Sequence, residues 1–332
     1  MNTVSLPSPA DAATPPPRRV KPQPPAWRLG LIVAVVCAAG YVAVPDLLGL
    51  LTRMAIMALL VLSVDLVVGY AGLATLGQAA MFGAGAYSAG LVALKLSADP
   101  LIGLAGGALA GGLTAGITGL FLLRYQGFTF LMLTIAAAEI LQSVAGKARA
   151  LTGGDDGLSG FFMAPLFGRI EFDMEGRTAY AYATVVLVLV LWALRRLVNS
   201  PFGLSVQGIH QSRARMSALG TAIVPQLWRM YTLAGAVAGL AGALSAQSAG
   251  IVGLDTLSFS LSAEALVMLV LGGSGRLHGA LIGTLIFMLL HHTAASINPY
   301  HWLFVIGALL MAVVLLRRGG WQRLWAQRKA AK

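Results

Sequence analysis

Residues 195–229 read RRLVNSPFGLSVQGIHQSRARMSALGTAIVPQLWR, a polar and basic stretch without aspartate or glutamate. Apolar runs long enough to cross a bilayer flank it, at residues 178–194 and 229–250. Lys and Arg resist translocation and are retained on the cytoplasmic side of a membrane. The stretch therefore predicts a cytoplasmic segment between two membrane spans, and it is long enough to carry a function.

The composition supports a membrane protein with several spans. Of 332 residues, 58% are hydrophobic and 11% are charged, and the mean hydropathy is +0.80; soluble domains carry about 25% charged residues. A net charge of +11 would suggest nucleic acid in a soluble domain, but these bases lie between and beyond apolar segments without interleaved aromatic residues. This pattern argues against nucleic-acid binding.

Charge also sets the expected number of spans. Apolar segments lie at residues 29–44, 47–70, 72–94, 101–123, 128–146, 178–194, 229–250, 261–292 and 300–316. With the N-terminus inside, nine crossings would leave the basic C-terminal tail outside, against the inside preference of bases. Glycines and polar residues between Gly272 and Gly279 interrupt one long segment, and splitting it there restores an even number. We expect an all-α transmembrane bundle of about ten (9–10) spans, including short or broken helices, with both termini cytoplasmic.

The chain divides into three parts by composition. Residues 1–26 hold most of the 14 prolines and are expected to form a disordered cytoplasmic tail. Residues 27–318 form the transmembrane domain, with the cytoplasmic segment at about 198–226, and residues 319–332 form a basic cytoplasmic tail.

Four ionisable residues fall inside the expected spans: Arg53, Asp65, Glu139 and Glu264. Charge in the hydrocarbon is costly, so such side chains usually face protein, water or a partner. Arg53 and Asp65 lie near span ends, where we expect them to reach the hydrated interface. Glu139 is roughly central, and both a role in a pathway and a hydrogen bond to a neighbouring helix remain open.

Glycines recur within the expected spans at a spacing of four. Examples are Gly103, Gly107 and Gly111 in one segment, and Gly235 and Gly239 in another. Small residues at this spacing let helix backbones approach closely. We therefore expect tight helix packing at these positions.

Motifs of catalysis and nucleotide binding are lacking in the sequence. The Gly146-Lys147 pair is followed by alanine, so there is no phosphate-binding loop. His291 and His292 are adjacent, so they point to different helix faces, and no carboxylate is close in the sequence. Cys37 is the only cysteine, which excludes a disulfide within one chain. We expect no enzyme activity, no catalytic residues, no cofactor and no metal site.

Four blocks of sequence resemble one protein family. Residues 69–87 read GYAGLATLGQAAMFGAGAY, and further blocks follow in order at 152–158, at 200–220 and at 264–279. Together they resemble the LivM-type permeases of branched-chain amino acid ABC importers, over residues 47 to about 316. The resemblance implies a permease subunit that forms part of the translocation pathway for branched-chain or related amino acids.

The resemblance also implies location and partners. A LivM-type permease is a multi-pass protein of the bacterial inner membrane that works with a homologous second permease as a heterodimer. It works further with two cytoplasmic ABC ATPase subunits and with a periplasmic substrate-binding protein that delivers the amino acid. ATP hydrolysis is then expected in the separate ATPase subunits, and membrane lipid is the remaining partner.

Site residues follow from the same resemblance. The basic segment matches the short cytoplasmic helix that seats in the ATPase, starting at Pro201 and ending near Gly220. The candidate coupling residues are Gly208, Ile209, Arg213, Arg215, Met216, Ala218, Leu219 and Gly220. His210, Gln211 and Ser212 replace the usual charged run of the family, so the familiar acidic contact is absent.

The segment from Gly69 to Tyr87 is only weakly apolar around its centre, as expected for a broken helix that lines a cavity. Candidate pathway residues are Thr75, Gln78, Tyr87 and Glu139. Gln78 stands where histidine is common in the family. The candidate periplasmic loop consists of Gly153, Gly154, Asp155, Asp156 and Gly157.

Three alternatives stay open at this point. Related permeases carry urea, short amides or other amino acids, and the sequence does not distinguish these substrates. A self-sufficient channel or ion-coupled carrier would use Asp65, Glu139 and Glu264 to bind protons or cations. Finally, the basic segment alone also fits an interfacial helix that is held by anionic lipid.

Overall fold

The computed structural model of the protein describes residues 47–161, 164–165, 176–297 and 307. The predicted tails at 1–26 and 319–332 lie outside these residues. The predicted first span at 29–44 lies outside them as well, as does the last span at 300–316 apart from Gly307.

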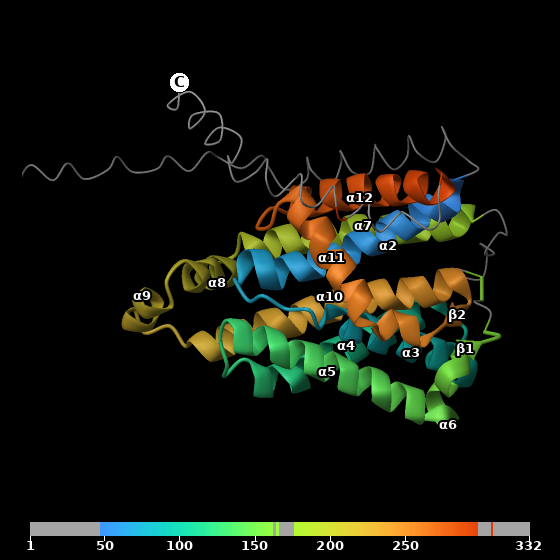
Figure 1. The fold of residues 1–332 in the computed structure, drawn as a ribbon, viewed down its shortest axis with the longest axis horizontal. Coiled ribbons are helices and arrows are strands. Elements are labelled where there is room, and N and C mark those ends of the chain that lie inside the picture. Colours follow the sequence, from blue (N-terminus) through green and yellow to red (C-terminus); the bar gives the residue numbers. More distant parts are fainter. Residues whose placement is uncertain (1–46, 162–163, 166–175, 298–306, 308–332) are drawn as a thin grey trace, which may run out of the picture.

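The described chain is a bundle of helices with one very small sheet (Figure 1). The long helices are α2 (Leu48–Asp65), α3 (Gln78–Lys95), α4 (Pro100–Leu122), α5 (Phe128–Lys147), α7 (Arg177–Val198), α10 (Ile223–Ala249), α11 (Phe259–Gly272) and α12 (Leu277–Ile297). The short elements are η3 (Leu66–Tyr70), α6 (Arg149–Thr152), η4 (Gly154–Asp156), β1 (Leu158–Ser159), α8 (Pro201–Gln211), α9 (Arg213–Ala218), β2 (Ile251–Val252) and η5 (Leu254–Leu257). β1 and β2 pair antiparallel, with Leu158 opposite Val252. The helical bundle agrees with the prediction, whereas the β1–β2 pair was not predicted.

Within the described residues, five helices are long and apolar enough to cross a membrane. They are Leu48–Tyr70, Pro100–Leu122, Phe128–Lys147, Arg177–Val198 and Ile223–Ala249. A sixth candidate is the pair α11 and α12, which bends by 113° at its break. The multi-pass prediction is therefore supported, and the total of about ten spans stays a prediction.

α10 lies at the centre of the bundle and packs against α2, α3 and α4. Glycines make this close packing possible, because a Cβ atom at Gly239 would overlap the backbone of Gly107 and Gly111 on α4. A Cβ atom at Gly85 on α3 would in turn overlap the backbone of Gly239. The predicted role of these glycines in helix packing is confirmed.

The chain between α2 and α3 is not helical. α2 continues through one π-helical turn, η3, and the backbone is then irregular from Ala71 to Gly77 before α3 begins at Gln78. The predicted span at 72–94 is thus shorter than expected at its start. The prediction of a broken helix within residues 69–87 is confirmed.

A second break separates α11 from α12. It lies where the sequence predicts a break that gives an even number of membrane crossings. Gly273 and Gly275 take positive φ angles of 98° and 77°, which favour glycine because it has no Cβ atom. The predicted break between Gly272 and Gly279 is confirmed, whereas its interpretation as two separate crossings stays a prediction.

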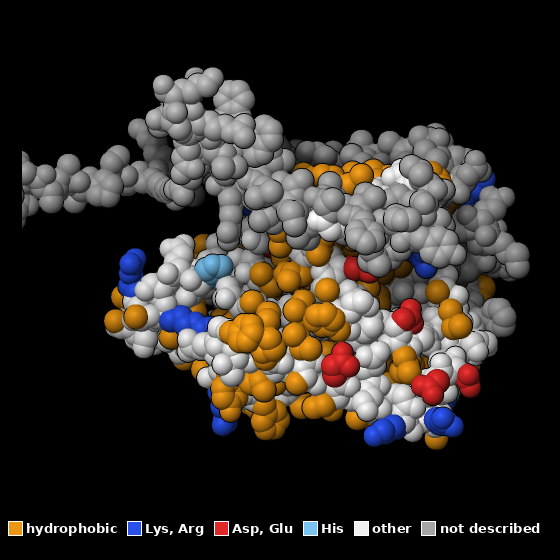
Figure 2. Space-filling view, in the orientation of Figure 1, with side chains coloured by type: hydrophobic (Ala, Val, Ile, Leu, Met, Phe, Trp, Pro, Cys, Tyr) orange, Lys and Arg blue, Asp and Glu red, His pale blue; other side chains and the backbone are white. Residues whose placement is uncertain are grey.

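Two groups of short elements lie at opposite ends of the bundle (Figure 1). α8 and α9 project from one end, and α6, β1 and β2 lie at the other. On the face drawn in Figure 2, the α8–α9 end carries basic side chains without acids, and the acids lie toward the other end. The lack of acids at the α8–α9 end of this face agrees with the acid-free basic stretch in the sequence.

Candidate functional site

Two predicted pathway residues, Thr75 and Gln78, lie together at the break between α2 and α3. Their side chains are 2% and 1% exposed. The Thr75 hydroxyl oxygen accepts a hydrogen bond from the backbone N–H of Gly77 at 3.2 Å. Within the described part of the chain, neither polar atom of the Gln78 amide has a hydrogen-bond partner. A buried amide without partners is rare in folded proteins and is a candidate ligand contact.

Three side chains from other helices complete the surroundings of this break. Thr134 on α5 accepts a hydrogen bond from the Leu76 N–H at 3.3 Å, and Ser262 on α11 accepts one from the Ala79 N–H at 2.9 Å. The buried Tyr231 on α10 lies close to Thr75 and to Thr118 of α4. Backbone groups freed by the break are thus satisfied by protein, as required inside a membrane.

Asp65 joins the first break to the second. Its Oδ1 atom accepts a hydrogen bond of 2.7 Å from the backbone N–H of Gly275, and the side chain is 0% exposed. Gly69 must be small here, because a Cβ atom at this position would overlap Asp65 and Gly275. The expectation that Asp65 reaches the hydrated interface was wrong. The carboxylate instead holds the α11–α12 turn against the end of α2.

Tyr87 and Glu139, the other predicted pathway residues, lie apart from Thr75 and Gln78. Tyr87 is nine residues beyond Gln78 on α3, about 14 Å at 1.5 Å per residue. It is 5% exposed, packs in a cluster with Leu158 and Leu257, and has a buried hydroxyl without a partner among the described residues. The structure therefore does not gather all four predicted residues into one site.

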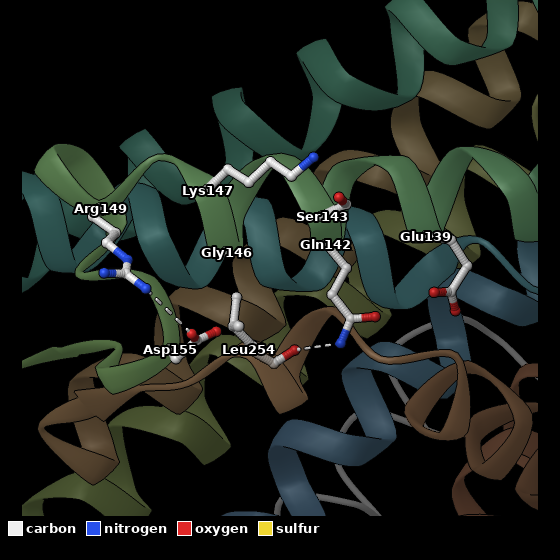
Figure 3. Close-up of a pocket in the computed structure, with 8 residues that line it drawn as sticks. All are labelled: Glu139, Gln142, Ser143, Gly146, Lys147, Arg149, Asp155 and Leu254. Carbon is white, nitrogen blue, oxygen red and sulfur yellow. Dashed lines mark hydrogen bonds and ion pairs between the residues drawn. The ribbon is translucent and has the colours of Figure 1, made fainter.

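Glu139 lies on an exposed face of α5 and lines a wide pocket of about 610 Å³ (Figure 3). Gln142 lines the same pocket and donates a hydrogen bond to the carbonyl oxygen of Leu254 at 3.3 Å. Arg149 and Asp155 border its far end and form an exposed ion pair of 3.8 Å. The pocket is polar and open, so it differs in kind from the buried break.

The predicted periplasmic loop is a compact turn at the β1–β2 end of the bundle. Gly153, Gly154 and Gly157 have φ angles of 75°, 67° and 70°, and these positive values explain the glycines. A Cβ atom at Gly157 would overlap the carbonyl oxygen of Val252. Asp155 and Asp156 are exposed between these glycines.

The predicted coupling segment consists of two helices instead of one. α8 begins at Pro201, as predicted, with the Ser200 hydroxyl accepting from the Gly203 N–H at 3.3 Å. Ser212 takes extended angles, ends α8, and caps α9 through the Arg215 N–H at 3.3 Å. Serine favours such cap positions, so the single helix predicted from Pro201 to near Gly220 is broken at Ser212.

The candidate coupling residues divide by exposure. Ile209 is 1% exposed and belongs to the core of the bundle. Gly208 packs against Met216 and so joins α8 to α9. Arg213 is partly buried, which lowers the pKa of its guanidinium. The exposed members lie at the tip of the segment: Arg215, Ala218, Leu219 and Gly220. Leu219 is 74% exposed, and Gly220 follows it with a φ angle of 79°.

The coupling segment touches the first helix break directly. A Cβ atom at Gly72, whose φ angle is 71°, would lie 2.7 Å from Nδ1 of His210. His210, at the end of α8, therefore packs on the irregular segment between α2 and α3. Sequence reasoning noted His210 only as a departure from the family pattern, because its partner lies far away along the chain.

Five helices that are long and apolar enough to cross a membrane, together with two helix breaks joined through Asp65, indicate a multi-pass membrane protein. The sequence pattern of the family described as "Branched-chain amino acid transport system / permease component" matches residues 47–314. The chain belongs to this family.

Curated relatives agree with this assignment. The high-affinity branched-chain amino acid transport system permease protein LivM of Salmonella typhimurium is 26% identical over 296 residues, covering 81% of this chain and 68% of the relative. LivM of Escherichia coli is 25% identical over 285 residues, covering 78% and 66%. The ribose import permease protein RbsC of Bacillus subtilis is 26% identical over 310 residues, covering 87% and 91%. The matches thus span about two thirds of the two LivM proteins. No solved structure matches the chain.

Proposed function

We propose that this chain is the transmembrane permease subunit of an ATP-binding cassette importer for branched-chain or related amino acids. Family membership supports the transport role, and the names of the LivM relatives support the substrate class. The relative that imports ribose has a similar identity, so the substrate needs its own test.

One structural observation carries the mechanism: the α8–α9 segment is packed on the helix break through His210 and Gly72. The exposed Leu219 at its tip is an apolar side chain suited to a cleft of a cytoplasmic partner. Motion of a docked ATPase would reach the break through α8, because Val206 and Ile209 are buried in the bundle. Arg213 and Arg215 would meet acidic groups of that partner.

The break itself is the proposed pathway element. Thr75 and Gln78 are buried polar side chains at the start of α3, and the Gln78 amide offers both a donor and an acceptor to a passing substrate. The helix N-terminus adds a positive partial charge that favours a carboxylate. Tyr87 and Glu139 would contact substrate nearer the β1–β2 end.

The partners follow from the same proposal. A second, homologous permease forms the heterodimer, two ABC ATPase subunits supply the hydrolysis, and a periplasmic binding protein delivers the amino acid. The α8–α9 end faces the cytoplasm of the bacterial inner membrane, and the loop from Gly153 to Gly157 faces the periplasm. Residues 1–26 and 319–332 are proposed cytoplasmic tails flanking the membrane domain.

Leu219→Glu tests the coupling role in the complete complex. We expect ATP-dependent uptake to fall at least tenfold while the permease still inserts and assembles, because a charge replaces the apolar tip residue. Leu96→Glu is the matched control, since Leu96 is 80% exposed at the opposite end of α3. Normal uptake by Leu219→Glu would refute the coupling role.

A further inference from the structure

A second cavity, of about 380 Å³, lies between α2, α3, α10, η5, α11 and α12. Its size falls within the range of about 300–1,000 Å³ that is typical of small-molecule sites. No residue proposed above for the pathway lines it. We refer to it as the Arg53 pocket, after the cation that α2 contributes.

The Arg53 pocket contains opposite charges that are not paired with each other. Arg53 comes from α2, Glu264 from α11 and Asp255 from η5. Among the described residues, no ion pair within 4 Å is found between Arg53 and either Glu264 or Asp255. Arg53 and Asp255 are exposed and Glu264 is partly buried, and a charged side chain in a membrane span is a candidate for a functional site. The pocket thus presents a cation and two carboxylates to whatever occupies it.

The remaining wall is largely apolar. Ile56 and the rings of Phe82 and Phe287 line the cavity, and all three side chains are buried. Phe287 stacks with His291, with ring centroids 6.3 Å apart. A ligand complementary to both the charged and the apolar lining residues carries one positive group, one negative group and an apolar side chain. Urea and short amides carry no charge, and a sugar offers hydroxyl groups but no charge for Arg53 or Glu264.

The Arg53 pocket and the helix break involve the same two helices, α3 and α11. Phe82 on its wall is one helical turn beyond Gln78 on α3. Glu264 is two residues from Ser262, whose hydroxyl receives the Ala79 N–H at the start of α3. The cavity and the unpaired Gln78 amide therefore share the same two helices.

We propose that the Arg53 pocket is a transit site for an α-amino acid with an apolar side chain, in which Arg53 holds the carboxylate and Glu264 the ammonium group. This assignment rests on the proposed function, because it presumes that an amino acid passes through the chain. It specifies which side chains of the permease recognise the amino acid, independently of the binding protein.

Equilibrium binding to the complete complex in lipid nanodiscs, without the binding protein, tests the pocket. The probe is radiolabelled L-leucine, and the competitors are leucinamide, which lacks the carboxylate, and 4-methylpentanoate, which lacks the ammonium group. We expect wild-type protein to prefer leucine over each competitor by at least tenfold.

Each variant should lose recognition of one charged group of leucine, either the carboxylate or the ammonium group. Arg53→Gln should weaken leucine binding about 10- to 100-fold, as expected for a hydrogen bond to a charged group, and leave leucinamide unchanged. Glu264→Gln should weaken leucine similarly and leave 4-methylpentanoate unchanged. Misfolding would weaken all three compounds together, and Arg53→Lys should recover part of the affinity. Lys95→Gln is the control, because Lys95 lies at the end of α3 outside the pocket.

ATP-dependent leucine uptake by the wild-type complex, measured in parallel, separates the two proposals. If uptake is normal and both variants bind all three compounds as wild type does, the pocket assignment is overturned and the proposed function stands. Equal weakening of all compounds in a folded variant also overturns the assignment. If the wild-type complex neither binds nor transports leucine, both the pocket assignment and the proposed substrate fail.

Discussion

The hydrogen bond between Asp65 and Gly275 should measurably stabilise the bundle. Asp65→Ala removes the carboxylate oxygen that accepts the hydrogen bond of the Gly275 N–H at 2.7 Å, from a side chain that is 0% exposed. A hydrogen bond to a charged group contributes about 1.5–3 kcal/mol, and the buried N–H left without a partner adds to the loss. We therefore expect a fall of about 2–3 kcal/mol in the free energy of unfolding.

Asp65→Asn distinguishes this bond from a general effect of the position. Asparagine keeps a carbonyl oxygen that can accept from Gly275, so its cost should be about 1 kcal/mol or less. Thr52→Ala is a matched control on the same helix, because the Thr52 hydroxyl is buried but bonds only to Leu48, one turn away. The assay is reversible unfolding in mixed micelles titrated with sodium dodecyl sulfate. A cost for Asp65→Ala within 0.5 kcal/mol of that for Thr52→Ala would refute the reasoning.

Three further predictions concern packing, coupling and surface charge. Gly239→Val should prevent stable folding, because its side chain would overlap the α4 backbone, whereas Gly49→Val, with nothing within 4 Å, should be tolerated; thermal melting in detergent compares the two. His210→Ala should lower ATP-driven uptake severalfold without changing assembly, because it removes the contact with Gly72; unchanged uptake would argue against that link. Arg149→Gln should cost less than about 1 kcal/mol, since the Arg149–Asp155 pair is 79% and 78% exposed; a larger loss in the same melting assay would contradict this.

Features that depend on local sequence were predictable. The Ser200-Pro201 start of α8 follows from capping and from the fixed φ angle of proline. The break at Gly272 to Gly279 followed from glycine content and charge parity, and the structure has it between α11 and α12. Glycine spacing indicated where α4 and α10 approach, because only small residues allow such contact.

Features that depend on contacts between distant segments were not predictable. Asp65 meets Gly275 across 210 residues, and Ser262 meets Ala79 across 183. In a membrane span both faces are apolar, so hydrophobic pattern does not reveal which face packs and which is exposed. Glu139 illustrates this, since its central place in the sequence of α5 gave no sign of its exposed face. The Arg53 pocket was not predicted, because its lining residues come from six elements that are spread along the sequence.

Energy-coupled import of an amino acid is tested most directly by transport in liposomes that contain the permease pair, both ATPases and the binding protein. Labelled L-leucine, urea and ribose are supplied separately, with and without ATP inside the cytoplasmic compartment. We expect leucine to accumulate only with ATP, and its uptake to be lost when the ATPases are omitted. Accumulation of leucine by this chain without ATPases would contradict the importer role, and uptake of urea or ribose but not leucine would contradict the proposed substrate.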